Sequence, residues 1–261
     1  AILSADISAD QTQIAAGSSN KMVRIYSTTD GSVLREIKKH TDWVTQVEYS
    51  PDGVLLATGD RNGGLFVWEA FTGREYFSLR GHTAMITDLS WRDDSNVLAS
   101  ASEDTTVKLW EMENGGNIKS WGAHGGGALW VQYTHDGRLV SCGRDRVPKV
   151  WDGNGAQQRA FDATPDLTLR CCFSHDGGRV IAGDWTGLIK VWATAESRDH
   201  PLNPQRSSGN AVQTRNGRSS NRAPRSPTSV IRTLDARRGA QGIRARVTHV
   251  AGRFSRGGWN R

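Results

Sequence analysis

An internal repeat with a period of roughly 40–45 residues constrains this chain more than any other feature of its sequence. A short apolar run that ends in an aromatic residue recurs five times at nearly constant spacing. The aromatic residues are Tyr26, Trp68, Trp110, Trp151 and Trp192. Three histidines, His40, His82 and His124, keep the same spacing. Independent landmarks with one period predict an array of five equivalent structural units.

Each period reads as four short strands. The segment VTQVEY alternates apolar and polar residues, and the Ser-Pro-Asp-Gly that follows is typical of a tight turn. VLLATG, LFVW and EYFSL follow, separated by polar turns. A four-stranded sheet with two apolar faces is stable only when other sheets cover it. The sequence therefore predicts an all-β fold in which such sheets stack as the blades of a β-propeller.

The repeats resemble those of the WD40 family over about residues 1–195, with repeats at about 1–39, 40–81, 82–123, 124–163 and 164–195. The resemblance implies that a blade holds a buried His, Ser or Thr, Asp and Trp joined by hydrogen bonds. Matching sets are His82, Ser100, Asp104 and Trp110, then His124, Ser141, Asp145 and Trp151, then His40, Thr58 and Trp68 with Asn62 in the Asp place. The first repeat has Ala16, Asn20 and Tyr26, and the fifth has Ala182, Thr186 and Trp192.

A Ser, His and Asp within one repeat could suggest a hydrolase. However, the same set recurs in successive repeats, whereas a catalytic set occurs once. The chain also has no phosphate-binding, dinucleotide-binding or zinc-protease motif. The strand residues predicted to line the centre, which are Gln46, Asp88, Trp130 and Arg170, do not converge on a reaction. We therefore expect no enzyme activity, no metal and no cofactor.

The remaining candidate for function is a surface. In WD propellers the partner commonly docks on the face formed by the loops before the first strand and after the second. In this sequence those loops carry Trp43, Arg61, Met85, Glu103, Arg144 and Trp185. Trp, Met and Arg are enriched in protein interfaces. The prediction is a non-catalytic scaffold that binds another protein, or another domain of the parent chain.

The last part of the sequence differs in composition. Residues 193–261 contain 14 Arg, no Lys and three acids, although the whole chain has a net charge of only +6. The segment lacks the repeat and is predicted to be a disordered tail over 196–261. Two interpretations stay open, a basic arm for nucleic acid and out-of-frame translation. Arg without Lys and a repeat that breaks off within a blade favour the second interpretation. The scarcity of aromatic residues that could stack on bases weakens the first.

Five repeats allow either a closed ring or an open arc. Residue 2 already falls in the first strand of a repeat, so we expect the chain to be a segment of a longer protein. Stretches such as AGDWTGLIKVW resemble bacterial WD segments of multidomain chains, some beside c-type haem modules. An accessory domain of such a protein, or a propeller-based enzyme, is the alternative function. No signal peptide or membrane-spanning segment is expected, and the compartment is not predicted.

Overall fold

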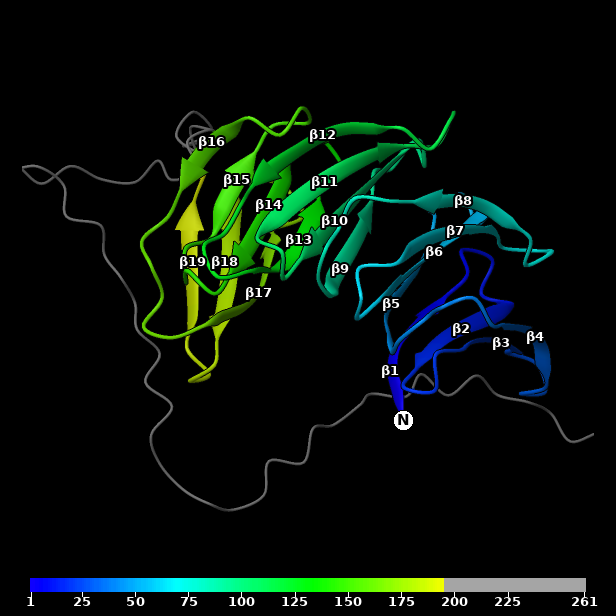
Figure 1. Cartoon of the computed structure of the whole chain (residues 1–261). Helices are drawn as coiled ribbons and strands as arrows, with labels where there is room; N and C mark the ends of the chain where they lie inside the picture. The colour runs from blue at the N-terminus through cyan, green and yellow to red at the C-terminus, as the bar shows by residue number, and fades with distance from the viewer. Residues whose placement is uncertain (195–261) are drawn as a thin grey trace, which may run out of the picture. The chain divides into compact units, whose positions relative to one another are not determined.

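Residues 1–194 are described by the structure, a computed structural model, and they form five antiparallel sheets called blades 1 to 5 in chain order (Figure 1). The predicted tail, residues 196–261, lies outside the described residues. The prediction of an all-β fold built from propeller blades is confirmed.

Each blade is a meander in which consecutive strands pair. Blade 1 contains β1 (Ile2–Ile7), β2 (Gln13–Ser18), β3 (Val23–Ser27) and β4 (Val33–Ile37). Blade 2 contains β5 (Val44–Tyr49), β6 (Leu55–Asp60), β7 (Leu65–Glu69) and β8 (Glu75–Leu79). Blade 3 contains β9 (Ile86–Trp91), β10 (Val97–Ser102), β11 (Thr106–Glu111) and β12 (Asn117–Gly122). Blade 4 contains β13 (Ala128–Tyr133), β14 (Leu139–Gly143), β15 (Lys149–Trp151) and β16 (Gln157–Ala160). In blade 5, β17 (Thr168–Phe173), β18 (Arg179–Asp184) and β19 (Ile189–Ala193) are described.

The turn after the first strand of blade 2 shows why the sequence folds locally in this way. Ser50 Oγ accepts the backbone N–H of Leu55 at 2.9 Å and donates to Asp52 Oδ1 at 2.6 Å. Gly53 closes the turn at a φ of +73°, a conformation that glycine adopts without steric cost. Ser and Asp side chains thus replace the backbone partners that a tight turn lacks.

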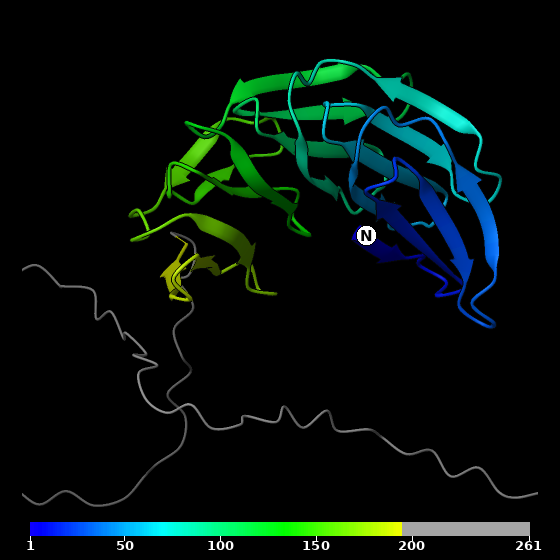
Figure 2. The same ribbon diagram turned by 60° about the horizontal axis from the view of Figure 1, so that its bottom comes forward.

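Neighbouring blades bury one another's apolar faces. Four apolar clusters form between successive blades, each combining the second to fourth strands of one blade with the first to third of the next. In Figure 2 the five sheets follow one another in chain order, with β1 in the first and β19 in the last. Burial of this area is the main stabilising contribution, at about 25 cal/mol per Å² of apolar surface.

Pro148 shortens the third strand of blade 4. Proline has no backbone N–H to donate to a neighbouring strand, and β15 accordingly begins only at Lys149 and has three residues. The blade keeps its four strands because Pro148 O still accepts the N–H of Phe161 at 3.0 Å. Across residues 1–194 no helix is long and apolar enough to cross a membrane.

Candidate functional site

The loops predicted to bind a partner occupy equivalent positions in every blade. The residue before the first strand accepts a backbone hydrogen bond from the residue after the second strand. The donor–acceptor pairs are Ser19 N and Ala1 O at 2.9 Å, Arg61 N and Trp43 O at 2.9 Å, Glu103 N and Met85 O at 3.0 Å, Arg144 N and Gly127 O at 3.0 Å, and Trp185 N and Leu167 O at 2.9 Å. All six predicted residues therefore lie along one edge of the blades, which we call the loop face.

Two tryptophans of the loop face are exposed. Trp43 is 44% exposed, and the guanidinium of Arg61 lies over its ring, 4.9 Å from the centroid. Trp185 is 69% exposed. Such stacking holds an arginine in one orientation and leaves its edge free to donate hydrogen bonds. The loop face thus presents large aromatic surfaces together with an oriented cation.

An ion pair joins neighbouring blades on the same face. Arg144 Nη2 of blade 4 lies 2.5 Å from Glu103 Oε1 of blade 3. Met85, on the loop before β9, is half-buried. Because the pair is partly exposed, its contribution to stability is small, but it fixes the position of both side chains.

The structure brings together the predicted hydrogen-bond sets of blades 2, 3 and 4. His82 Nδ1 lies 2.7 Å from Asp104 Oδ2, His82 Nε2 lies 2.7 Å from Ser100 Oγ, and Trp110 Nε1 donates to Ser100 Oγ at 2.9 Å. The same contacts in blade 4 measure 2.8, 2.7 and 2.7 Å between His124, Asp145, Ser141 and Trp151. In blade 2, Thr58 Oγ1 lies 2.8 Å from His40 Nε2 and accepts Trp68 Nε1 at 2.8 Å.

The sets of blades 3 and 4 are electrostatically arranged for a neutral imidazole and an ionised carboxylate. Burial lowers the pKa of His82, against the opposing effect of its bond to Asp104. Burial would raise the pKa of Asp104, but the hydrogen bonds from His82 and Thr106 outweigh it and lower that pKa. The imidazole, hydroxyl, carboxylate and indole satisfy one another inside the blade, so the sets serve the stability of the fold.

The carboxylate of blade 2 is not where the sequence alignment put it. The prediction placed Asn62 in the Asp position, but His40 Nδ1 binds Oδ2 of Asp60 at 2.9 Å. Asp60 Oδ1 also accepts the backbone N–H groups of Asn62 and Gly64. In blade 2 the last residue of β6 reaches the imidazole, whereas in blade 3 a turn residue two positions further along the repeat does so.

Blades 1 and 5 lack the full set. In blade 1, Ser18 Oγ bonds with Asn20 Oδ1, and Ala16 supplies no hydroxyl. Blade 5 has Ala182 in the hydroxyl position and Thr164 where blades 2, 3 and 4 have histidine. Thr186 Oγ1 donates to Asp184 Oδ1 at 2.6 Å.

The predicted central residues lie on the first strands and contact neighbouring blades. Arg170 lies 3.7 Å from the ring centroid of Trp130, and Gln46 Nε2 donates to the carbonyl of Thr87 at 2.5 Å. Asp88 Oδ2 accepts the N–H of Val131 at 3.0 Å. Burial raises the pKa of Asp88 well above its ordinary value. In the part of the chain that the structure describes, no group of three or more His, Cys, Asp or Glu side chains is placed to hold a metal ion.

Sequence reasoning missed Glu48. Its Oε2 is buried without a hydrogen-bond partner among residues 1–194. Burial raises the pKa of Glu48 well above its ordinary value, and the negative charges of Asp88 and Asp6 raise it further. A signal existed, because Glu48 lies two residues after Gln46 and so shares its side of β5. The carboxyl group is a costly element of the inner strands and not part of a recognisable catalytic pair.

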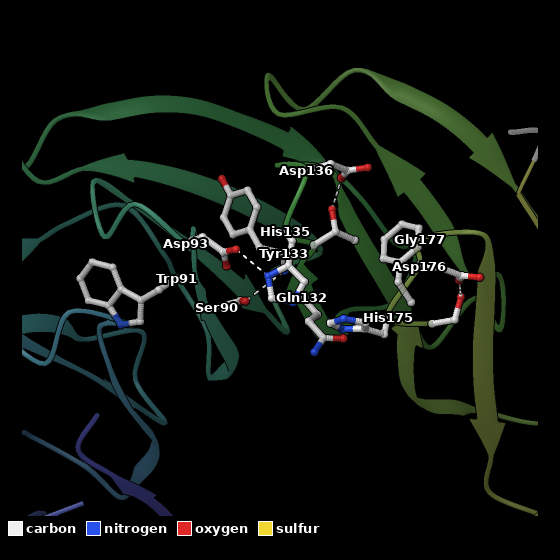
Figure 3. Close-up of a pocket in the computed structure, with 13 residues that line it drawn as sticks. Ser90, Trp91, Asp93, Gln132, Tyr133, His135, Asp136, His175, Asp176 and Gly177 are labelled. Carbon is white, nitrogen blue, oxygen red and sulfur yellow. Dashed lines mark hydrogen bonds and ion pairs between the residues drawn. The ribbon is translucent and has the colours of Figure 1, made fainter. Parts of the chain in front are cut away.

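A hollow of about 530 Å³ opens at the opposite ends of the first strands, between the turns of blades 3, 4 and 5 (Figure 3). His135 and His175 lie in these turns and are exposed. His135 Nδ1 lies 2.6 Å from Asp93 of the neighbouring blade, and the two imidazole centroids are 5.6 Å apart. Polar side chains line the hollow together with Trp91, Tyr133 and Phe173, and the contact of His135 with Asp93 joins two blades there.

Comparison with known proteins agrees with this architecture. The family model "WD domain, G-beta repeat" matches residues 31–69, 73–111, 115–152 and 159–193. The solved structure titled "Structure of U3-55K" superposes with a TM-score of 0.68 at 22% identity, covering 74% of this chain and 61% of that one. "Crystal structure of RRP9 WD40 repeats" gives a TM-score of 0.69 at 21% identity, covering 74% and 60%. The chain thus spans about three fifths of the length of these structures, and at such identity the likeness concerns the fold alone. No curated protein matches by sequence.

Proposed function

The chain belongs to the WD40 repeat family, and from that premise we propose that it is an interaction scaffold whose loop face binds a partner protein. Propellers of this family generally serve as scaffolds for other proteins. The proposed contact residues are Trp43, Arg61, Met85, Glu103, Arg144 and Trp185.

The exposure of Trp43 and Trp185 is the observation that supports this face most. An exposed indole leaves a large apolar area in water, and aromatic residues dominate binding energy when a partner covers them. Arg61 is already stacked on Trp43, so little side-chain entropy remains to be lost on binding. The scaffold would act by holding these groups in fixed positions on rigid strands.

The proposed partner is another protein or another domain of a longer polypeptide. The loop face combines two arginines and one glutamate with aromatic surface, a composition found at protein interfaces. An enzyme at the centre of the blades is a weaker candidate, because Asp88 and Arg170 are engaged with neighbouring blades.

Affinity capture from the source cells, followed by titration with the purified partner, tests the proposal. The Trp43→Ala/Trp185→Ala double variant should bind at least tenfold more weakly, since each hot-spot aromatic contributes about 2 kcal/mol or more. Phe71→Ala is the matched control, because Phe71 is 77% exposed in the turn between β7 and β8, away from the loop face. Equal affinity of the double variant and the control would contradict the assignment of this face.

A further inference from the structure

One position of the turn after the first strand carries a side chain of a metal-binding type in blades 3, 4 and 5. The same backbone hydrogen bond closes the three turns, from Ser95 N to Arg92 O at 2.8 Å, from Gly137 N to Thr134 O at 3.0 Å and from Gly177 N to Ser174 O at 2.8 Å. The second residues of these turns are Asp93, His135 and His175. Because they hold one position in successive blades, the repeat places each of them beside the next.

The two imidazoles meet across the boundary between blades 4 and 5. The ring centroids of His135 and His175 are 5.6 Å apart, and the ring planes are inclined by 76°. Both side chains are exposed and line the hollow shown in Figure 3. Zinc binds an imidazole nitrogen at about 2.0–2.1 Å, so one ion shared by two rings holds their centroids roughly 5–6 Å apart. The observed spacing therefore suits two ligands of a single ion.

Asp93 orients the ring of His135. His135 Nδ1 lies 2.6 Å from Asp93 Oδ2, a contact that joins blades 3 and 4. When Nδ1 carries the hydrogen and donates it to the carboxylate, the lone pair of Nε2 is left free for a metal ion. Histidines that bind metals ordinarily have such a partner on their second nitrogen, because it fixes the ring and raises its basicity.

His175 has no competing partner. Its imidazole makes no hydrogen bond or ion pair within residues 1–194, and its ring contacts that of His135. A histidine whose nitrogens are not engaged by a carboxylate or a backbone group can turn either nitrogen toward an ion. His175 is thus available as the second ligand.

The other carboxylates of the hollow are held by their own turns. Asp136 accepts hydrogen bonds from Arg138 Nε at 2.8 Å and from the hydroxyl of Thr134. Asp176 accepts Ser174 Oγ at 2.5 Å. This agrees with the finding that no group of three or more such ligands is assembled within residues 1–194. An ion at the hollow therefore has two protein ligands, and water fills its remaining positions.

We propose that His135 and His175 bind a divalent transition-metal ion, with Asp93 as the positioning residue. Imidazole ligands favour Cu²⁺, Ni²⁺ and Zn²⁺, of which Cu²⁺ binds most tightly, whereas Mg²⁺ prefers oxygen ligands. The bound ion links blades 4 and 5 on the side of the blades opposite the loop face. The site does not depend on the proposed partner of that face.

Isothermal titration calorimetry of the full chain without an affinity tag tests the proposal. Cu²⁺ should bind with one tight site per chain, Zn²⁺ should compete for it more weakly, and Mg²⁺ should not bind. His135→Gln and His175→Gln should each weaken Cu²⁺ binding by about tenfold or more, because each removes one of the two ligands. Both positions are exposed, so the melting temperature should stay within about 2 °C of the wild-type value.

Two further variants separate this site from other ligands of the chain. His200→Gln/His249→Gln is the matched control, since it removes the two histidines outside the described residues and keeps the pair. It should bind Cu²⁺ as tightly as the wild type. Asp93→Asn keeps both ligands but weakens the orientation of one, and should lower the affinity by about tenfold without changing the stoichiometry.

Electron paramagnetic resonance of the Cu²⁺ complex reports the ligands directly. The wild type should show coupling to two imidazole nitrogens, and His135→Gln or His175→Gln should show at most one. A wild-type chain that binds no Cu²⁺ would overturn the proposal, and so would a His135→Gln or His175→Gln variant that binds it as tightly as the wild type. Loss of the tight site in the His200→Gln/His249→Gln control would place the ion elsewhere. Unchanged affinity of Asp93→Asn would contradict the positioning role of Asp93.

Discussion

Nδ1 of His40 lies 2.9 Å from Oδ2 of Asp60, so the carboxylate that holds this imidazole comes from the last residue of β6. In blade 3 the corresponding carboxylate, Asp104, comes from the turn that follows the strand. The hydrogen-bond set therefore tolerates two positions for its acid. Asp184 occupies in blade 5 the position of Asp60, but its buried Oδ2 has no hydrogen-bond partner within residues 1–194.

Completing the set of blade 5 should stabilise the protein. Thr164→His would place an imidazole where His40 lies in blade 2, and Ala182→Ser would supply the hydroxyl between it and Trp192. Because a buried acceptor without a partner costs about 1–3 kcal/mol, the double variant should gain about 1–2 kcal/mol in the free energy of unfolding by urea. Thr164→His alone should gain less or nothing, because it removes the contacts of Thr164 Oγ1 with Asp166 O at 2.6 Å and with Thr168 Oγ1 at 2.7 Å. A double variant no more stable than the wild type would contradict the equivalence of Asp184 and Asp60.

Removing an acid from a complete set should have the opposite effect. Asp104→Ala leaves His82 Nδ1 buried without its acceptor, and we expect a loss of about 1–3 kcal/mol in the free energy of unfolding. Glu113→Ala is the control, since Glu113 is an exposed residue of the turn between β11 and β12. The control should change stability by less than about 0.5 kcal/mol. Equal effects at the two sites would mean that the set of blade 3 is not structural.

Much of the fold could be predicted from the sequence, because five copies of the repeat each indicate the same structural unit. The period of the aromatic residues indicated the blades, and Ser50 with Asp52 indicated the turn that follows β5. The positions of His82, Ser100 and Trp110 followed from the same period, and the structure places them within hydrogen-bond distance. Regular spacing is informative here since each blade buries the same positions against its neighbour.

Single departures from the repeat could not be predicted in the same way. The repeat period places Asn62 opposite His40, because Asn62 stands where Asp104 stands in the next repeat. The actual partner, Asp60, reaches the imidazole because of the direction of its side chain, which the period does not predict. Glu48 was missed because a lone charged residue in an alternating strand ordinarily faces water. Its burial depends on the neighbouring blades, and so on the three-dimensional arrangement of β1, β5 and β9.

The buried histidines should make the fold sensitive to acid. Burial lowers the pKa of His82 and His124 in the folded protein, whereas an unfolded histidine titrates near about 6.5. Below about pH 6.5 the unfolded state therefore binds more protons than the folded state. The stability that the two histidines contribute is complete above this pH and is lost as the pH falls below it. An NMR titration should find both imidazoles less than half protonated at pH 6.5. The stability difference between wild type and His82→Gln should also narrow from pH 7.5 to 5.5, and a constant difference would contradict the argument.

Glu48 should contribute to the pH dependence with the opposite sign. Burial raises its pKa well above the ordinary 4.5, so the folded state retains a proton that the unfolded state releases. Stability from this group is consequently present at low pH and is lost as the pH rises above about 4.5, by about 1.4 kcal/mol for each pH unit until the folded pKa is reached. Glu48→Gln removes the ionisable group while keeping its shape. Urea unfolding should find the variant more stable than the wild type at pH 7 and no more stable at pH 4. As the control, Glu113→Gln at an exposed position should leave the dependence of the unfolding free energy on pH unchanged. If the same dependence for Glu48→Gln runs parallel to that of the wild type, the carboxyl group of Glu48 is solvated in the folded protein.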